Sequence, residues 1–253
     1  MSEPKIALIT GGSRGLGANA ALALAERGVD SIVTYRNNRS AADVIVDKIR
    51  ALGGKALALQ LDTGDSSSFS DFSRSLQTAL TEHWQTQAIN YLVNNAGHGH
   101  SALIGEMRED DFDELYRVHV KGPYFLSQTL LPVIADGGAV LNISSGLARF
   151  SLPGSSAYAC MKGAVEVMSR YQAKELALRG IRVNTLAPGA IATDFAGGTV
   201  RDNPDANGFV ASVTALARAG EADDIGPVIA SLLSDDNHWI TGQRIEASGG
   251  MFL

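Results

Sequence analysis

The sequence predicts one α/β domain over residues 1–253, built on a doubly wound, mostly parallel sheet of seven strands with helices on both faces. Two observations predict this fold. Short apolar segments alternate with longer segments whose apolar residues have helical spacing, through most of the chain. No linker, repeat or compositional break divides them. Such alternation is typical of parallel strands that are connected by helices.

Local patterns place each element in chain order. Runs rich in apolar and β-forming residues predict strands at 6–10, 31–35, 56–61, 89–93, 139–143, 181–186 and 244–246. Helical periodicity predicts helices at 18–27, 41–52, 66–83, 110–134, 157–178 and 222–233. Gly53 and Gly54 are typical of a helix C-terminus, and Asp65 or Ser66 is suited to cap the third helix.

The first strand runs directly into a glycine-rich turn, Gly11 to Gly17, which reads Gly-Gly-Ser-Arg-Gly-Leu-Gly. Glycine lets the backbone bend with positive φ and leaves the amide groups open to a phosphate. The helix expected next presents free N–H groups and a positive dipole at its N-terminus. The spacing differs from the common Gly-x-Gly-x-x-Gly fingerprint. The turn therefore predicts a nucleotide diphosphate site, with an ordinary strand-to-helix turn as the alternative.

Composition and charge exclude several classes of function. The chain has 45% hydrophobic and 19% charged residues, as a globular domain does. A net charge of −6 gives no basic surface for nucleic acid or an acidic membrane, and no apolar run is long enough to span a bilayer. We expect no signal peptide, because residues 1–5 run straight into the first expected strand, and the single cysteine, Cys160, excludes an internal disulfide. We expect a soluble cytoplasmic protein.

Polar or turn-forming residues follow six of the expected strands. They are Thr10 with Gly11, Arg36, Asp62, Asn94 with Asn95, Ser144 with Ser145, and Pro188 with Gly189. Ligands in such sheets lie beyond the carboxyl ends of the strands, so we expect a single cleft there. The stretch from 187 to about 207 is irregular and rich in Gly, Asp and Asn, and residues 187–215 are expected to form a substrate loop or lid.

The end of the second strand bears on which nucleotide binds. A carboxylate about 20 residues beyond the glycines selects NAD by accepting hydrogen bonds from its ribose. This chain ends the strand with Tyr35 and Arg36 and has no acid before Asp43. Arg36 and Arg14 can pair with a 2′-phosphate, although each alone is also typical of a solvated surface arginine. We expect NADP(H) to be preferred over NAD(H).

Tyr158 and Lys162 stand four residues apart on an expected helix, which places both side chains on one face. A free phenol has a pKa near 10, and a neighbouring cation lowers it towards the range that acid–base catalysis needs. Alone, the pair is also typical of a helix surface. Ser145 comes 13 residues before Tyr158, directly after the fifth strand.

Taken in order, these signals resemble those of the short-chain dehydrogenase/reductase family over essentially the whole chain. The chain has Thr-Gly-x-x-x-Gly-x-Gly from Thr10, Asn-Asn-Ala-Gly from Asn94, Ser145, Tyr-x-x-x-Lys from Tyr158, and Pro188-Gly189. The resemblance is to the carbonyl-reductase-like and 3-oxoacyl-reductase-like branch. It implies a Rossmann fold and an NADP(H)-dependent oxidoreductase that interconverts a carbonyl and a secondary alcohol by hydride transfer.

The resemblance also implies roles for individual side chains. Tyr158 is expected to be the general acid, and Lys162 to lower the Tyr158 pKa and bind the nicotinamide ribose. Ser145, in preference to Ser144, is expected to hold the substrate oxygen as negative charge develops there. The expected cofactor-binding residues are Gly11, Ser13, Arg14, Gly15, Leu16, Gly17, Tyr35, Arg36, Asp62, Thr63, Asn94, Ala96, Gly97, Tyr158, Lys162, Pro188, Gly189, Ile191 and Thr193.

Specific roles are expected for two of these residues, Asp62 and Asn94. Asp62 is expected to serve the adenine amino group, with a carboxylate satisfied within its own turn as the alternative. Asn94 is expected to support the sheet and to line the cofactor site. No metal is expected to take part.

One position departs from the family pattern. The family usually has Val-Asn-x-Lys-Gly, in which the Asn helps to hold a water that leads from the lysine to solvent. Here the segment from Val118 to Gly122 has His119 in place of that Asn. Histidine donates and accepts hydrogen bonds and titrates near neutrality, so it can replace the relay as a catalytic residue. A packed helix histidine without a catalytic part is the alternative.

The expected substrate residues beside Ser145 are mostly apolar, namely His98, Leu147, Phe150 and Phe195. They favour an uncharged ketone, aldehyde or ring carbonyl. The alternative is a 3-oxoacyl thioester of acyl carrier protein or CoA. An acidic carrier needs a basic landing patch, and residues 130–142 contain no lysine or arginine, with Arg179 the one nearby candidate. A more remote alternative is a non-catalytic NADP(H)-binding sensor or scaffold.

The resemblance further implies a homotetramer or homodimer, built partly on the helices expected at 110–134 and 157–178. The apolar C-terminal segment, residues 249–253, is expected to pack either at a subunit contact or on its own subunit. Cys160 has no evident histidine–acid partnership and is expected to be a small buried residue.

Overall fold

The computed structural model describes residues 5–253, in which seven parallel strands form one sheet in the order β3-β2-β1-β4-β5-β6-β7. The predicted doubly wound α/β fold is confirmed, and the sheet is entirely parallel. The strands are β1 (Ile6–Ile9), β2 (Asp30–Tyr35), β3 (Ala56–Gln60), β4 (Ile89–Asn94), β5 (Ile134–Ile143), β6 (Arg182–Pro188) and β7 (Arg244–Ala247). The expectation about a signal peptide falls on residues 1–4, outside the described part.

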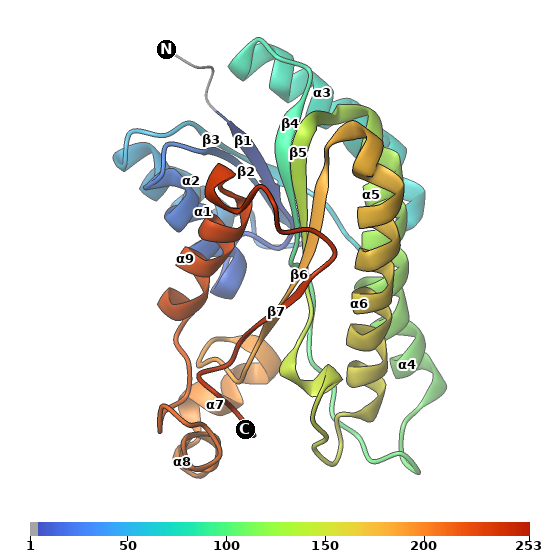
Figure 1. Ribbon diagram of the computed structural model, residues 1–253, viewed down its shortest axis with the longest axis vertical. Helices are drawn as coiled ribbons and strands as arrows, with labels where there is room; N and C mark the ends of the chain where they lie inside the picture. Colours follow the sequence, from blue (N-terminus) through green and yellow to red (C-terminus); the bar gives the residue numbers. More distant parts are fainter. Residues whose placement is uncertain (1–4) are drawn as a thin grey trace.

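Helices cover both faces of the sheet (Figure 1). They are α1 (Gly15–Ala25), α2 (Arg39–Ala51), α3 (Phe69–Trp84), α4 (Glu109–Tyr116), α5 (Gly122–Leu130), α6 (Ser156–Leu176), α7 (Thr199–Asp202), α8 (Pro204–Ser212) and α9 (Ala222–Leu233). Within residues 5–253, no helix combines the length and the apolar character needed to cross a lipid bilayer.

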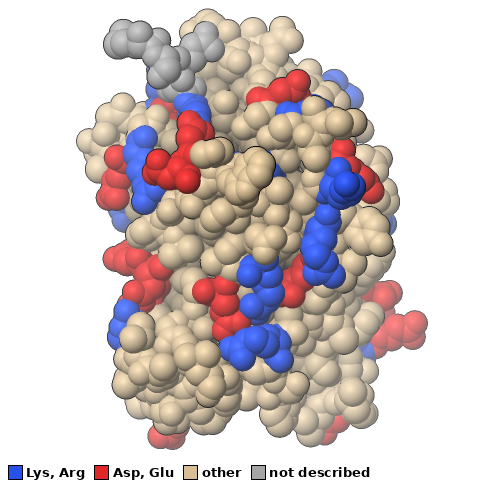
Figure 2. Space-filling model, in the orientation of Figure 1, with Lys and Arg blue, Asp and Glu red and all other residues tan. Residues whose placement is uncertain are grey.

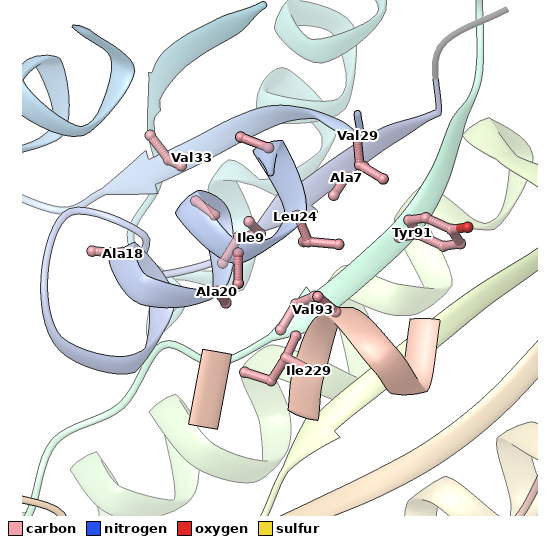
Figure 3. Close-up of a cluster of buried hydrophobic side chains, with 14 of the residues drawn as sticks. Ala7, Ile9, Ala18, Ala20, Leu24, Val29, Val33, Tyr91, Val93 and Ile229 are labelled. Carbon is pink, nitrogen blue, oxygen red and sulfur yellow. The ribbon is translucent and has the colours of Figure 1, made fainter. Parts of the chain in front are cut away.

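Two buried clusters fix these layers. On one face, α1, α2 and α9 pack on the sheet, and Figure 3 shows Leu24 of α1 and Ile229 of α9 in one cluster with Ile9 and Val93 of the sheet. On the other face, Phe72 and its neighbours join α3, α5 and α6 to the sheet. Both faces are apolar, so the strands are buried on both sides, as parallel strands require.

The helix expected at 110–134 is not continuous. It is divided into α4, a π-helical turn at Arg117–Lys121 and α5, and β5 begins at Ile134, five residues earlier than expected. Pro123 has no N–H to donate to the carbonyl of His119, which favours the change in hydrogen-bond register at this turn. The turn matters because His119 lies within it.

Candidate active site

The glycine turn after β1 is fixed by hydrogen bonds from Asn95, which directly follows the neighbouring strand β4. Asn95 Nδ2 donates to the carbonyl oxygens of Thr10 and Gly11 at 2.9 and 3.3 Å. A Cβ at Gly17 would lie 2.4 Å from the Gly11 oxygen, and Gly11 has a φ of +64°. Only glycine fits both positions, because the backbone approaches itself so closely and bends so sharply. The turn then opens α1, whose first turn has no acidic side chain.

Tyr158 and Ser145 meet at the carboxyl end of β5. The Tyr158 hydroxyl lies beside the Ser145 side chain. Burial raises the pKa of Tyr158 above its ordinary value, and the neighbouring Ser145 hydroxyl opposes that rise. The phenol therefore holds its proton firmly. This differs from the expectation that Lys162 lowers the Tyr158 pKa, because desolvation is the larger effect here.

Lys162 lies one helical turn after Tyr158 and is almost fully buried. Its Nζ donates to the carbonyl oxygen of Ile143 at 2.9 Å and lies 5.4 Å from the centroid of the Tyr158 ring. Burial lowers the pKa of Lys162 from 10.5 to about 7. The side chain is thus poised between its charged and neutral forms near neutral pH.

The two serines after β5 point to different partners. The Ser144 hydroxyl donates to Glu166 Oε1 at 2.8 Å and is buried. Ser145 instead caps the one-turn helix Gly146–Ala148, where its Oγ accepts from the Leu147 N–H at 3.2 Å. Of the two serines, it is Ser145 that lies beside Tyr158, and its role in catalysis stays a prediction.

His119 is 1% exposed and packs edge-on against Tyr158, with ring centroids 5.2 Å apart. Its Nε2 lies 2.8 Å from the carbonyl oxygen of His98, while Nδ1 is buried without a hydrogen-bond partner. Burial, with the charge of Lys162, places the pKa of His119 well below its ordinary value of 6.5. The expectation that His119 titrates near neutrality is therefore wrong, because an imidazolium in this position would be desolvated.

Comparisons with known proteins show the family of the chain. A family model described as enoyl-(acyl carrier protein) reductase matches residues 11–252. The chain belongs to the short-chain dehydrogenase/reductase family. It is therefore an oxidoreductase of the family whose members act on carbonyl and alcohol groups.

Among curated relatives of this short-chain dehydrogenase/reductase is the 3-oxoacyl-[acyl-carrier-protein] reductase FabG of Staphylococcus aureus, 33% identical over 255 residues and the full length of both chains. Among solved structures, the promiscuous reductase LugOII, which catalyses keto-reduction at C1 during lugdunomycin biosynthesis, is 37% identical with a TM-score of 0.93 and 98% coverage of both chains. The angucycline C-6 ketoreductase LanV, solved with bound NADP, is 33% identical with a TM-score of 0.93 and covers 98% of this chain and 95% of its own.

In this short-chain dehydrogenase/reductase, Arg36 lies between two carboxylates. Its Nε is 2.8 Å from Asp62 Oδ2, and its Nη1 is 4.0 Å from Glu114 Oε1. Asp62 also accepts from the N–H of Gly64 at 2.9 Å, which matches the turn-carboxylate alternative. Arg14 is exposed and precedes α1. Arg36 thus stands at the end of β2 with most of its side chain in solvent.

The other expected cofactor residues lie along the same edge of the sheet. Tyr35, Asn94 and Pro188 are the last residues of β2, β4 and β6. The residues that follow a strand are Asp62 and Thr63 after β3, Ala96 and Gly97 after β4, and Gly189 and Ile191 after β6. Thr193 lies within 4.0 Å of the position of a Cβ on Gly15, so the loop after β6 reaches the glycine turn. Asn94 supports the sheet as expected, since its Nδ2 donates to Asn142 Oδ1 at 2.7 Å. This edge fits an extended dinucleotide.

The expected substrate residues are brought together only in part. The Phe195 ring lies 5.8 Å from the Tyr158 ring, and the His98 ring lies 5.4 Å from that of His119. Phe150, by contrast, packs on Phe252 near the C-terminus, with ring centroids 4.8 Å apart. Leu147 follows Ser145 in the one-turn helix.

The segment expected to be an irregular loop contains short helices. Phe195–Gly198 forms a tight turn in which Ala196 and Gly197 have positive φ, and the short helices α7 and α8 follow it. Asn203 caps α8 through its side chain, which accepts from two backbone N–H groups, and Pro204 is the first helical residue. An Asn-Pro pair is typical of a helix start, but the composition of this segment, rich in Gly, Asp and Asn, favoured a loop in the sequence analysis. Cys160 is exposed, not buried as expected, because it faces away from the sheet on α6.

Sequence reasoning gave no role to Asn95 and did not identify Glu166, and both side chains support the site through hydrogen bonds. Asn95 ties the glycine turn to β4, and Glu166 receives the Ser144 hydroxyl. The position of Glu166, one helical turn beyond Lys162, was the available signal for its place on the inner face of α6. Within residues 5–253, no group of three or more His, Cys, Asp or Glu side chains gathers as metal ligands.

Proposed function

We propose that this chain is an NADP(H)-dependent ketoreductase that interconverts an uncharged ketone, aldehyde or ring carbonyl and its alcohol, with Tyr158 as the general acid. One observation carries the proposal. The protonated hydroxyl of Tyr158 and the hydroxyl of Ser145 lie side by side at the carboxyl end of β5. Two adjacent O–H donors suit a carbonyl oxygen that gains negative charge.

Ser145, Tyr158 and Lys162 each have a separate role in the proposed reaction. A bound NADPH would supply the hydride for the carbonyl carbon. Ser145 donates a hydrogen bond to the carbonyl oxygen, and Tyr158 transfers its proton to that oxygen, so that the alcohol leaves neutral. The raised pKa of Tyr158 keeps its proton in place until the oxygen becomes basic. Lys162, with a pKa of about 7, can then stabilise the phenolate and return a proton.

The dinucleotide would be held by the residues of the strand ends. The amides of Gly11 to Gly17 would bind the diphosphate at the N-terminus of α1, where no acidic residue opposes an anion. Arg36 would pair with a 2′-phosphate, in exchange for its present carboxylate partners. The NADP bound to LanV, a relative at 33% identity, supports NADP(H) as the preferred cofactor.

An uncharged ring ketone is the favoured substrate class. Two aromatic rings, those of His119 and Phe195, pack against Tyr158, and the His98 ring lies beside that of His119. Flat aromatic surfaces of this kind suit a planar substrate through stacking. LugOII and LanV, both ketoreductases by name, support this class.

Reduction of a 3-oxoacyl thioester is the second candidate, which the similarity to FabG favours. A carrier protein would need a basic landing site near Ser145. Arg179 cannot serve, because it binds Asp136 at 2.7 Å and the Leu131 oxygen at 2.8 Å, before and at the start of β5. The candidate site lies at the other end of that strand. Acidic and basic side chains are interspersed over the face in Figure 2, without a broad basic area. A non-catalytic sensor is disfavoured by the adjacent hydroxyls.

We further propose that the chain forms a homotetramer or homodimer. Large apolar side chains are exposed on the outer sides of α4, α5 and α6, including Tyr116, Tyr124, Val167 and Tyr171. Burial of these side chains against a second copy would remove apolar surface from water. Light scattering during gel filtration checks this, and a monomer at micromolar concentration would contradict it.

NADPH oxidation against a carbonyl panel tests the proposed function. The panel comprises aryl, cyclic and aliphatic ketones, diketones and 3-oxoacyl thioesters, each with wild type and Tyr158→Phe. Turnover that Tyr158→Phe abolishes supports the proposal, and the preferred substrate separates the two candidates. Turnover that survives in Tyr158→Phe would overturn the role of Tyr158. NADPH binding without turnover on the whole panel would favour the sensor.

A further inference from the structure

Four charged side chains join the Ser145 segment to the C-terminal strand. Arg149 donates to both oxygens of Glu246, from Nε at 2.8 Å and from Nη2 at 2.6 Å. Arg244 donates from Nη1 to Glu246 Oε2 at 2.8 Å and from Nε to Glu166 Oε1 at 2.7 Å. We call these four residues the Arg149–Glu246 network. It alternates in charge, so each charge has an opposite neighbour.

One end of the network reaches the serines. Glu166 Oε1 accepts from the Ser144 hydroxyl at 2.8 Å, and Arg244 Nη2 lies 3.5 Å from the backbone oxygen of Ser145. The segment between these serines and Arg149 is a single helical turn. A segment this short has little rigidity of its own, so its orientation depends on what anchors it.

The other end of the network holds the last residues of the chain. Arg149 donates to the carbonyl oxygens of Met251 and Phe252 at 2.8 and 3.2 Å. The Phe252 ring packs on Phe150, and Met251 is 2% exposed. The C-terminal segment therefore packs on its own subunit at these two positions, although Leu253 is 97% exposed.

Partial burial strengthens these contacts. The side chains of Glu166, Glu246 and Arg244 are 15%, 19% and 23% exposed. Charges at this depth are screened less than surface pairs, and the two-point contact of Arg149 with Glu246 fixes the angle between them. Hydrogen bonds, chiefly from Arg149, lower the pKa of Glu246 to about 2, so this carboxylate stays charged at working pH.

We propose that the Arg149–Glu246 network positions the Ser145 hydroxyl for catalysis, so that the C-terminal strand and the last residues form part of the active-site scaffold. The inference rests on the proposed role of Ser145 as the donor to the substrate oxygen. Arg149 and Glu246 are positioning residues, since they act through the Ser145 segment. A small displacement of the Ser145 hydroxyl weakens its hydrogen bond to the transition state more than it weakens substrate binding. Loss of the network should therefore lower kcat more than it raises KM.

Glu246→Gln is the first test, because it keeps the size of the side chain and removes its charge. We expect kcat for the carbonyl substrate to fall about tenfold, with KM and the Kd for NADPH, measured by its fluorescence, within about twofold. Asp136→Asn breaks the Arg179–Asp136 ion pair at the other end of the sheet and serves as the matched control, with unchanged kinetics. Unchanged kcat in Glu246→Gln would overturn the proposal.

A double-mutant cycle with Ser145→Ala separates positioning from general stability. Single-turnover rates, measured with enzyme in excess over substrate, quantify the low activity that remains in the Ser145→Ala variants. If the network acts through Ser145, Glu246→Gln has no further effect on the rate in the Ser145→Ala background. Additive losses would overturn the proposal. An unchanged rate in Ser145→Ala itself would instead remove the proposed role of Ser145, which is a separate failure.

Milder variants keep the test valid if Glu246→Gln does not fold. Arg149→Lys keeps the charge without the two-point contact, and Phe252→Ala removes the ring that packs on Phe150. We expect each variant to lower kcat, by less than Glu246→Gln does. In the Ser145→Ala background we expect neither variant to lower the rate further. Losses of equal size in that background would overturn the proposal.

Discussion

The imidazole of His119 packs edge-on against the phenol of Tyr158, with ring centroids 5.2 Å apart and an interplanar angle of 86°. The contact comes from two different helical segments, the π-helical turn before α5 and the start of α6. Gly97 makes room for it, because a Cβ there would lie 2.5 Å from His119 Cε1. His119 is thus part of the wall around the Tyr158 phenol, as a neutral ring.

Replacement of this ring tests whether it also carries protons. We expect His119→Asn to leave turnover within about tenfold, roughly 1.4 kcal/mol of barrier, since a neutral His119 is not a proton donor at working pH. Steady-state rates from about pH 6 to pH 9 check this. A loss of a hundredfold or more would show that His119 is integral to proton transfer.

The two serines after β5 are expected to differ sharply. Ser145→Ala removes a donor to the reacting oxygen, so kcat should fall about 10²- to 10³-fold. Ser144→Ala should lower kcat by less than about tenfold, because that hydroxyl is committed to Glu166 at 2.8 Å. The pair has the same chemistry at adjacent positions, so each variant is the control for the other. Equal losses would refute the assignment.

Cofactor choice is expected to depend on Arg36. Arg36→Gln should raise the KM for NADPH about 10- to 100-fold, as expected for loss of a charge-assisted contact with phosphate, and leave the KM for NADH within about threefold. Initial rates with both cofactors measure the two constants. Equal increases for NADPH and NADH would show that Arg36 does not read the 2′-phosphate.

The buried ammonium of Lys162 predicts how stability varies with pH. Its pKa falls from 10.5 to about 7 on folding, so between these values the unfolded chain holds a proton that the folded chain lacks. Under this condition the free energy of unfolding rises with pH. Urea unfolding of wild type and Lys162→Met should therefore give a difference, wild type minus variant, that increases from about pH 7 to about pH 9.5. A flat or decreasing difference would show that the buried amine stays charged.

Much of the fold could be predicted because its signals are local. Apolar strand segments, the glycine turn and the Tyr158–Lys162 spacing each depend on a few neighbouring residues. Errors arose where a local signal was weak or was overridden. The break at Arg117–Lys121 depends on a single proline two residues beyond it, and α8 is hidden in a segment with a loop-like composition.

The sequence by itself determined the parallel α/β fold, the family, the glycine turn and the identity of the candidate catalytic residues. Only the tertiary structure decided what surrounds them. It separated Ser145 from Ser144, made His119 a buried neutral ring, and raised the pKa of Tyr158 in place of lowering it. It also joined Arg149 to Glu246, 97 residues away. The physical reason is that desolvation and long-range ion pairs depend on the distances between chain segments, which spacing along the sequence does not encode.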